Sequence, residues 1–301
     1  MSKENSRISV IIPIYNAEEY LPSLFDAIET NTFFEGDEIL LVDNGSTDNS
    51  VEFCKKAAMR KPKLYTCLSY SEVAGSYAAR NYAVKRAKGD ILVFTDSDCK
   101  PESGWIDVFR DNIKKGIVLA GNIQIEIENN GLWEHFDSLA HLNSEKNAKN
   151  NRVATANMAV LYDDFMRVGF FEKRFSGGDY EWSMRAVKNG MQILYLSNAV
   201  VLHPSRKTFE EILKKEQRIA YGVGNHAKIH KKSGFLLGVK YILKIFKIDT
   251  NYHYAKNLKK AGFSKKEIRA FHWKFMKIRV EQLSFAIKGY YDKDARKLGL
   301  K

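Results

Sequence analysis

Short apolar runs recur in the first hundred residues, at positions 8–14, 39–42 and 91–95. Their richness in Ile, Val and Leu is typical of strands that are buried on both faces of a parallel sheet. Amphipathic segments separate the runs, and we expect helices at about residues 19–30, 48–60 and 76–88. This alternation of strand and helix predicts a doubly wound α/β domain.

The pattern becomes mixed after residue 100. We expect further strands and helices, the strands at residues 123–127, 153–160, 191–196 and 199–202 and the helices at about residues 132–148, 163–168 and 181–189. The α/β part then ends near residue 204, where the sequence changes to helical patterns.

The C-terminal part, residues 205–301, differs from the front in charge. It carries 25 Lys and Arg against 8 Asp and Glu, whereas residues 1–204 carry 23 against 28. Two capping-box spacings occur in it, Thr208 with Glu211 and Ser264 with Glu267. We therefore predict a basic helical C-terminal region with a partner of its own.

Composition places the chain among globular proteins. Of its 301 residues, 45% are hydrophobic and 28% are charged. No apolar stretch reaches the roughly 20 residues of a membrane-spanning helix, and the polar start does not resemble a signal peptide. Three irregularly spaced cysteines fit reduced thiols rather than a disulfide framework or a zinc site. We expect a cytoplasmic protein.

Polar clusters follow all three apolar runs of the front part. They contain Tyr15 and Glu18, then Asp43-Asn44-Gly45-Ser46, then Asp96-Ser97-Asp98. Carboxyl ends of strands in an open α/β sheet border the crevice in which ligands bind. The second cluster also suits a turn that caps the next helix, which does not prevent Asp43 from facing a nucleobase.

The Asp96-Ser97-Asp98 segment is the strongest candidate for chemistry. Two carboxylates two residues apart, just past a buried strand, can converge on a hard divalent cation, which takes oxygen ligands and bridges phosphates. Asp and Ser are also common turn residues. The buried strand before the segment and the other polar strand ends favour the metal site.

Three further side chains each have a functional and a structural interpretation. Arg80 suits either contact with phosphates or an exposed helix surface. Asp179, after Gly177 and Gly178, suits either a general base or a helix N-cap. His203 suits either a metal ligand or a structural histidine. The residues alone leave these alternatives open.

Taken in order, these motifs resemble family 2 glycosyltransferases of the GT-A fold. The resemblance covers about residues 7–205, and its carriers are residues 10–16 (VIIPIYN), 38–50 (EILLVDNGSTDNS), 80–98, 155–190 and 201–203. It implies a nucleotide-binding half at about residues 1–100 and an acceptor-side half at residues 101–204. It also implies transfer of a sugar with inversion, from a UDP-sugar to an acceptor hydroxyl, in cell-surface glycan synthesis.

The resemblance implies roles for the matching positions. Those on the donor side are Pro13, Tyr15, Glu18, Asp43 and Asn44 in the nucleoside pocket, and Arg80, Asp96 and Ser97 along the rest of the donor. Asp98 and His203, together with Asp96, would hold Mn²⁺ or Mg²⁺ on the diphosphate.

Asp179 would be the catalytic base by the same resemblance. This sequence departs from the usual family pattern at two places. Gly178-Asp179 stands where the family usually has an acidic pair, which leaves Glu181 as a rival base. Asp43-Asn44 stands where many members have two aspartates.

Processive members of the family carry a Q-x-x-R-W motif. Here Gln217 and Arg218 are adjacent and no Trp follows, so we expect single additions. The alternatives are a metal-dependent nucleotidyltransferase and a non-catalytic nucleotide-sugar-binding protein. The basic region contains no recognisable nucleic-acid motif, and we do not expect a nucleic-acid partner.

Residues 234–248 (GFLLGVKYILKIFKI) form an amphipathic pattern. On a helix, Lys240, Lys244 and Lys247 share one face, and the other carries mainly Phe235, Val239, Ile242 and Phe246. The pattern suits a core helix with solvated lysines or a helix in a membrane interface. The basic surroundings favour the second, so we expect peripheral attachment to an anionic membrane surface, the inner face of the cell membrane, and a glycan or lipid-linked acceptor.

Overall fold

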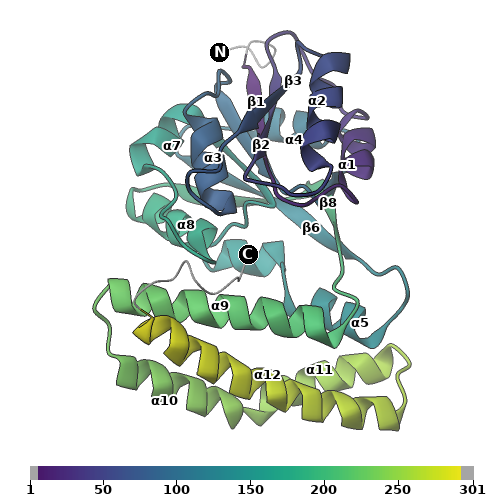
Figure 1. The fold of residues 1–301 in the computed structure, drawn as a ribbon, viewed down its shortest axis with the longest axis vertical. Helices are drawn as coiled ribbons and strands as arrows, with labels where there is room; N and C mark the ends of the chain where they lie inside the picture. Colours follow the sequence, from purple (N-terminus) through teal and green to yellow (C-terminus); the bar gives the residue numbers. More distant parts are fainter. Residues whose placement is uncertain (1–5, 293–301) are drawn as a thin grey trace. The chain divides into compact units, whose positions relative to one another are not determined.

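The computed structural model describes residues 6–292, and within them the chain divides into two compact units. We call the first the sheet unit (residues 6–125, 142–173 and 178–204) and the second the helical unit (residues 126–141, 174–177 and 205–292). The α/β class and the helical C-terminal region are as the sequence predicts (Figure 1). Among the described helices, none combines the length and the apolar composition that crossing a bilayer requires.

Eight described strands form one sheet. They are β1 (Ile8–Ile14), β2 (Glu38–Asp43), β3 (Tyr65–Ser69), β4 (Ile91–Thr95), β5 (Lys100–Pro101), β6 (Ile117–Glu126), β7 (Asn157–Leu161) and β8 (Gln192–Pro204), in the order β3-β2-β1-β4-β7-β6-β8-β5. Strands β3, β2, β1 and β4 are parallel, whereas β7 is antiparallel to both β4 and β6. The parallel part therefore has one edge at which three polar loops meet.

Helices cover both faces of this sheet. They are α1 (Leu21–Ile28), α2 (Ser50–Arg60), α3 (Ser76–Val84), α4 (Trp105–Asn112), α6 (Ser144–Lys149), α7 (Tyr162–Val168) and α8 (Gly178–Lys188). Alternate residues of β1 enter different cores: Val10 and Ile12 pack with Trp105, and Ile11 packs with Trp182. Burial on both faces explains why the strands appear in the sequence as continuous apolar runs.

The helical unit consists of α5 (Leu132–Ala140), α9 (Phe209–Ile229), α10 (Gly234–Ile245), α11 (Ile248–Lys260) and α12 (Lys265–Tyr291). Its aromatic core includes Phe136, Phe209 and Phe271. Helices α9 and α12 pack side by side at unusually close range (Figure 1). A Cβ atom on Gly224 would lie 1.9 Å from the carbonyl oxygen of Ala286, so this contact requires glycine.

The structure corrects several sequence-based boundaries. The single helix expected at residues 132–148 is two helices, α5 and α6, because Leu142 between them has a positive φ of 52°. The two strands expected at 191–196 and 199–202 are one strand, β8. Strand β3 and helix α4 have no counterpart in the sequence-based scheme; β3 is half exposed and lacks an apolar run. Both predicted capping boxes are confirmed.

Candidate active site

The loop after β1 is fixed to the loop after β2 by side-chain hydrogen bonds. The Thr47 N–H donates to Asn16 Oδ1 at 2.8 Å, and the Asn49 N–H donates to Glu18 Oε2 at 2.8 Å. Glu18, expected in the nucleoside pocket, thus holds the start of α2. Pro13 is buried within β1, and Tyr15 just beyond it is 37% exposed.

The two side chains at the end of β2 organise loops. The carboxylate of Asp43 accepts hydrogen bonds from the N–H groups of Gly45 and Ser46, each at 3.1 Å. The Asn44 amide donates to the carbonyls of Tyr70 and Val73 and accepts from the Gly75 N–H. Asn44 therefore holds the loop between β3 and α3, whereas Asp43 retains unused acceptor capacity on both oxygens.

Arg80 and Asp96 form an ion pair between α3 and the loop after β4. The Arg80 side chain is 3% exposed and the Asp96 side chain 33% exposed, so the pair lies at the boundary between core and solvent. Ser97 and Asp98 continue the same loop and are half-buried. Arg80 is thus not the exposed helix-surface residue of the structural alternative.

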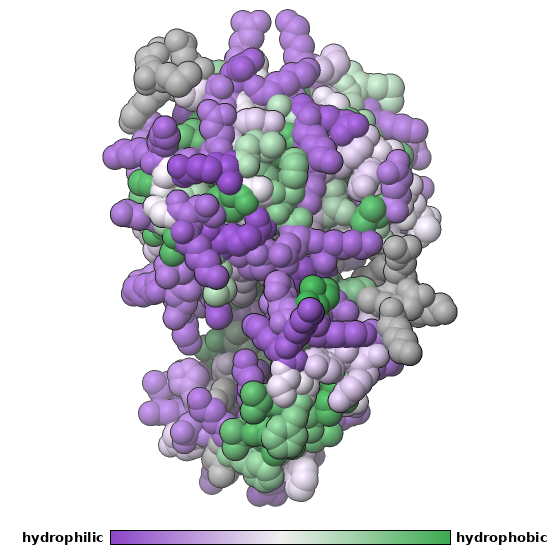
Figure 2. All heavy atoms as spheres, turned by 90° about the vertical axis from the view of Figure 1, so that its left-hand side faces the viewer, coloured by the Kyte–Doolittle hydropathy of each residue, from purple (hydrophilic) through white to green (hydrophobic). Residues whose placement is uncertain are grey.

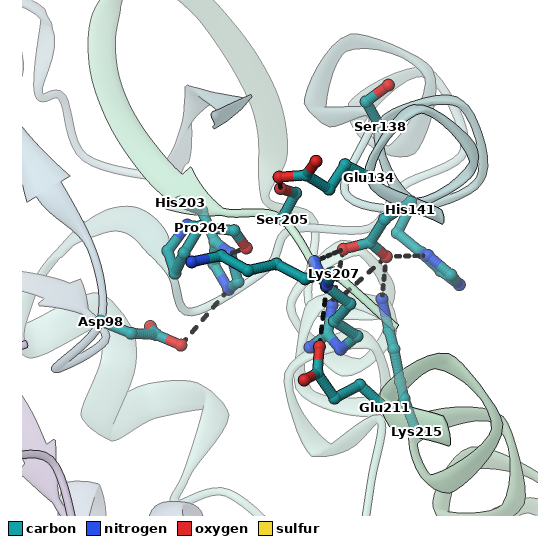
Figure 3. Close-up of polar contacts among 12 residues, drawn as sticks. Asp98, Glu134, Ser138, His141, His203, Pro204, Ser205, Lys207, Glu211 and Lys215 are labelled. Atoms are coloured by element: carbon teal, nitrogen blue, oxygen red, sulfur yellow. Dashed lines mark hydrogen bonds and ion pairs between the residues drawn. The ribbon is translucent and has the colours of Figure 1, made fainter. Parts of the chain in front are cut away.

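Asp98 and His203 face each other at the end of β8 (Figure 3). His203 Nε2 lies 3.7 Å from Asp98 Oδ2, which is longer than a hydrogen bond. His203 Nδ1 is 2.8 Å from the carbonyl oxygen of Pro204. A carbonyl only accepts, so Nδ1 carries a proton; in the neutral imidazole the lone pair of Nε2 then lies on the side of Asp98. This arrangement of a carboxylate and a tautomer-fixed imidazole fits a divalent cation.

Asp179 lies at the start of α8 with its carboxylate in contact with α3. Oδ1 accepts from the Tyr77 hydroxyl at 3.0 Å and from the Tyr180 N–H at 2.9 Å, and Oδ2 accepts from the Thr155 N–H at 3.3 Å. Burial raises the pKa of Asp179 above its ordinary value, against the lowering effects of Tyr77 and of the Arg80 charge. A raised pKa suits a group that must take up a proton.

Gly178 explains how Tyr77 reaches this carboxylate. A Cβ atom at position 178 would lie 2.8–3.0 Å from the Tyr77 ring, too close for any other residue. The glycine before Asp179, which the sequence offers in place of an acidic residue, therefore makes room for the ring that donates to Asp179.

Glu181 is engaged elsewhere. Its two oxygens accept from Arg185 Nε at 2.6 Å and Nη2 at 3.1 Å, and Arg185 also donates to the carbonyls of Val168 and Phe170. This bidentate pair ties the first turns of α8 to the segment that precedes them. The Asp179 carboxylate, by contrast, accepts from Tyr77 and feels the charge of Arg80.

Tyr77 and Thr155 were missed among the sequence-based site residues. Tyr77 lies three positions before Arg80, a spacing that puts both on one face of α3. That signal was readable in the sequence, whereas the Thr155 N–H is a backbone group with no side-chain signature. Tyr77, Arg80, Asp96 and Asp179 thus form one connected polar cluster in the sheet unit.

The helical unit contains a second cluster around Asp137, which is fully buried. Figure 3 shows two of its members, His141 and Lys215. The Asp137 carboxylate lies 2.5 Å from His141 Nδ1, 3.1 Å from Arg206 Nη1 and 3.3 Å from Lys215 Nζ. The His141 Nε2 atom is 2.7 Å from Glu216. This cluster was not expected from the sequence, because Arg206, Lys215 and Glu216 are distant along the chain from Asp137 and His141.

Together, the sheet, the polar loops at the carboxyl ends of its parallel strands, and the carboxylates of Asp96, Asp98 and Asp179 define a glycosyltransferase of the GT-A class. Residues 9–174 match the family model Glycosyl transferase family 2. The glycosyltransferase AglE of Haloferax volcanii is 33% identical over 221 residues, which cover 71% of this chain and 72% of AglE. The chain belongs to glycosyltransferase family 2.

Solved structures agree with this fold. The mannosyltransferase PcManGT from Pyrobaculum calidifontis, in complex with GDP-Man and Mn²⁺, superposes with a TM-score of 0.65 at 17% identity, covering 96% of this chain and 88% of that one. Residues 1–349 of Staphylococcus aureus TarS, in complex with UDP-GlcNAc, give 0.53 at 18% identity, covering 94% and 90%. At these identities the likeness establishes the GT-A fold, as expected from the sequence.

Proposed function

We propose that the chain transfers one sugar, with inversion, from a UDP-sugar to an acceptor hydroxyl in cell-surface glycan synthesis. The observation that carries this proposal is the connected cluster at the carboxyl edge of the sheet. There Asp179 has a raised pKa and lies beside Tyr77 and Arg80, and Arg80 pairs with Asp96.

The donor is assigned to the edge formed by β1, β2 and β4. Tyr15 offers an exposed ring for stacking on a nucleobase, and Asp43 offers carboxylate lone pairs. The loops of this site are held in place by Pro13, Glu18 and Asn44, which we do not assign to direct contact with the nucleotide. Complexes of similar folds with GDP-Man and with UDP-GlcNAc support a nucleotide-sugar donor here.

Asp98 and His203 are the residues that would hold Mn²⁺ or Mg²⁺, with Asp96 beside them. When bound, such a cation offsets the negative charge that develops on the departing diphosphate. The protein's part is to fix the orientation of the His203 ring through Pro204 and to hold Asp98 opposite it. Arg80 adds positive charge next to Asp96 and Ser97.

Asp179 is assigned as the base that removes the proton of the acceptor hydroxyl. Attack from the side opposite the leaving diphosphate in one displacement inverts the anomeric centre. Tyr77 and the N–H of Thr155 hold the carboxylate in place. Oδ1 already accepts two hydrogen bonds, whereas Oδ2 accepts one and keeps a lone pair for an incoming hydroxyl.

Single addition agrees with the contacts of α9. In the helical unit Gln217 donates to Glu281 at 2.9 Å, an internal contact between α9 and α12. The Gln217 side chain thus contributes to the packing of α9 on α12. A residue that binds a growing polysaccharide would instead leave its side chain available to the product. The acceptor proposed for one such addition is a glycan or a lipid-linked sugar.

The reaction is tested by incubating the protein with a panel of UDP- and GDP-sugars and simple glycoside acceptors. We expect release of a nucleoside diphosphate and a product one sugar longer, both abolished by excess chelator and restored by Mn²⁺. Release of pyrophosphate from a sugar phosphate and a nucleoside triphosphate would instead identify a nucleotidyltransferase. Full turnover in chelator would refute the metal assignment.

The base is tested by comparing Asp179→Asn with Glu181→Gln. Asp179→Asn should keep donor affinity and lose about 10²–10⁴ in turnover, the typical effect of a missing general base. Glu181→Gln loses part of the Arg185 pair and should mainly lower the melting temperature. An inactive Glu181→Gln beside an active Asp179→Asn would reverse the assignment.

A further inference from the structure

Helix α10 presents large apolar side chains to solvent. The exposed fraction is 78% for Phe235, 65% for Leu236, 64% for Leu243 and 73% for Phe246 just past the helix end. Figure 2 shows hydrophobic atoms gathered on the part of the surface that the helical unit forms. Exposure of several such side chains together is uncommon on a soluble surface unless the area binds something.

These side chains form one face of the helix. Phe235, Val239, Ile242 and Phe246 recur at helical spacing, and Leu236 and Leu243 lie alongside them. The residues of α10 that enter the core are Leu237 and Tyr241, which point to the opposite side. The exposed apolar face is therefore not explained by packing within the described part of the helical unit.

The lysines do not lie as the sequence pattern predicts. Lys244 lies over the Tyr241 ring at 4.5 Å, and burial together with the charge of Arg279 lowers its pKa. Lys240 and Lys247 are exposed and lie along one margin of the apolar face. An apolar face with lysines at its margin is the arrangement of a helix that lies in a membrane interface.

The charge around the apolar face of α10 indicates which kind of partner it binds. Residues 228–247 contain six Lys and no Asp or Glu. A second copy of the chain would bring the same lysines together, which is unfavourable, whereas an anionic lipid surface is complementary to them.

We propose that α10 docks the protein on an anionic lipid bilayer, with Phe235, Leu243 and Phe246 entering the interface and Lys240 and Lys247 facing lipid headgroups. The inference concerns the helical unit and does not depend on the sugar-transfer reaction. The bilayer would place the enzyme at the surface where lipid-linked acceptors are found.

The test is flotation of the full-length protein with vesicles of phosphatidylcholine alone or mixed equally with phosphatidylglycerol. We expect binding only to the anionic vesicles, weakened by high salt. Phe235→Asp/Leu243→Asp should reduce binding by at least ~10-fold, since each change removes a large apolar group from the interface. The matched control is Met59→Asp, an equally exposed apolar residue on α2, which should bind like the wild type.

The electrostatic part is tested with Lys240→Gln/Lys247→Gln against Lys259→Gln/Lys260→Gln. Both pairs remove two charges from the helical unit, but only the first pair flanks the apolar face. The first should weaken binding and flatten its salt dependence, and the second should change little. Equal loss in both pairs, or no flotation of the wild type at low salt, overturns the proposal. So does a wild-type dimer that Phe235→Asp/Leu243→Asp converts to a monomer without any vesicle binding.

Discussion

Two aspartate–histidine pairs in this protein have opposite surroundings. In the sheet unit, Asp98 and His203 lie 3.7 Å apart, beyond hydrogen-bond distance. In the helical unit, Asp137 lies 2.5 Å from His141 and also accepts from Arg206 and Lys215. The same residue types thus form an open pair in one unit and a saturated cluster in the other.

The difference shows in the ionisation of Asp137. Burial by itself would raise the pKa of this carboxyl, but the hydrogen bond from His141 and the charges of Lys215 and Arg206 hold it well below its ordinary range. A carboxylate in that state has no capacity left for a ligand and serves the fold. The open pair retains lone pairs on Asp98 and on His203, which is what a cation site needs.

The largest expected effect is that of Asp98→Ala. Loss of a cation ligand should remove ~4 kcal/mol of transition-state stabilisation, about 10³-fold in turnover. The melting temperature should stay near that of the wild type, because no strong hydrogen bond to the Asp98 carboxylate is lost. Turnover assays and thermal melts of the same preparation measure both. A collapse of stability would make Asp98 structural.

Asp137→Ala should have the opposite profile. Removing it takes away the counter-charge of Arg206 and leaves Glu216 alone to balance Lys215 and His141. Breaking a buried ion pair in this way typically costs about 3–5 kcal/mol. Urea denaturation should show this loss, while turnover per folded molecule stays within a few-fold of the wild type. An unchanged unfolding midpoint would contradict the saturated-cluster account.

A smaller effect is expected for Tyr77→Phe. Its hydroxyl lowers the pKa of Asp179 against the raising effect of burial. Without it the pKa rises further, and a base must be deprotonated to act. The acidic limb of the turnover–pH profile should therefore move to higher pH. Tyr82→Phe on the same helix is the matched control, because its ring stacks on Tyr70, away from Asp179.

The smallest effect concerns Lys215. Burial and the charge of Arg206 lower the pKa of Lys215 to about 7, although Asp137 and Glu216 oppose the shift. Above pH 7 the unfolded chain then binds more protons at this residue than the folded one, so stability rises with pH. The wild type should gain about 1 kcal/mol per unit between pH 7 and 9 relative to Lys215→Met. Parallel pH dependences in the two proteins would refute this assignment.

The parallel half of the sheet was predictable because its strands are buried on both faces. Val10, Ile11 and Ile12 enter two different cores, so the strand must be continuously apolar. The half-exposed strand β3 lacks that signal, and the break between α5 and α6 depends on the positive φ of Leu142, a residue that gives no such warning. Strand β3 and the break between α5 and α6 both depend on tertiary packing, which the local sequence pattern does not reveal.

The candidate site was predictable where residues follow strands directly. Asp96, Asp98 and Asp179 lie at carboxyl-edge loops or helix starts, as expected from their place in the sequence. The loop-holding contacts of Glu18 and Asn44 were not predictable, since both depend on backbone groups about 30 residues away along the chain. The Asp137 cluster was missed for the same reason, with partners up to 78 residues apart.

The most direct test of the account is calorimetric titration of UDP into the wild type, Asp98→Ala and Asp179→Asn, with Mn²⁺ and with excess chelator. We expect Mn²⁺-dependent binding to the wild type and to Asp179→Asn, and loss of this binding in Asp98→Ala at an unchanged melting temperature. Equal UDP binding by all three proteins in chelator would contradict the claim that the open aspartate–histidine pair holds the cation that binds the donor.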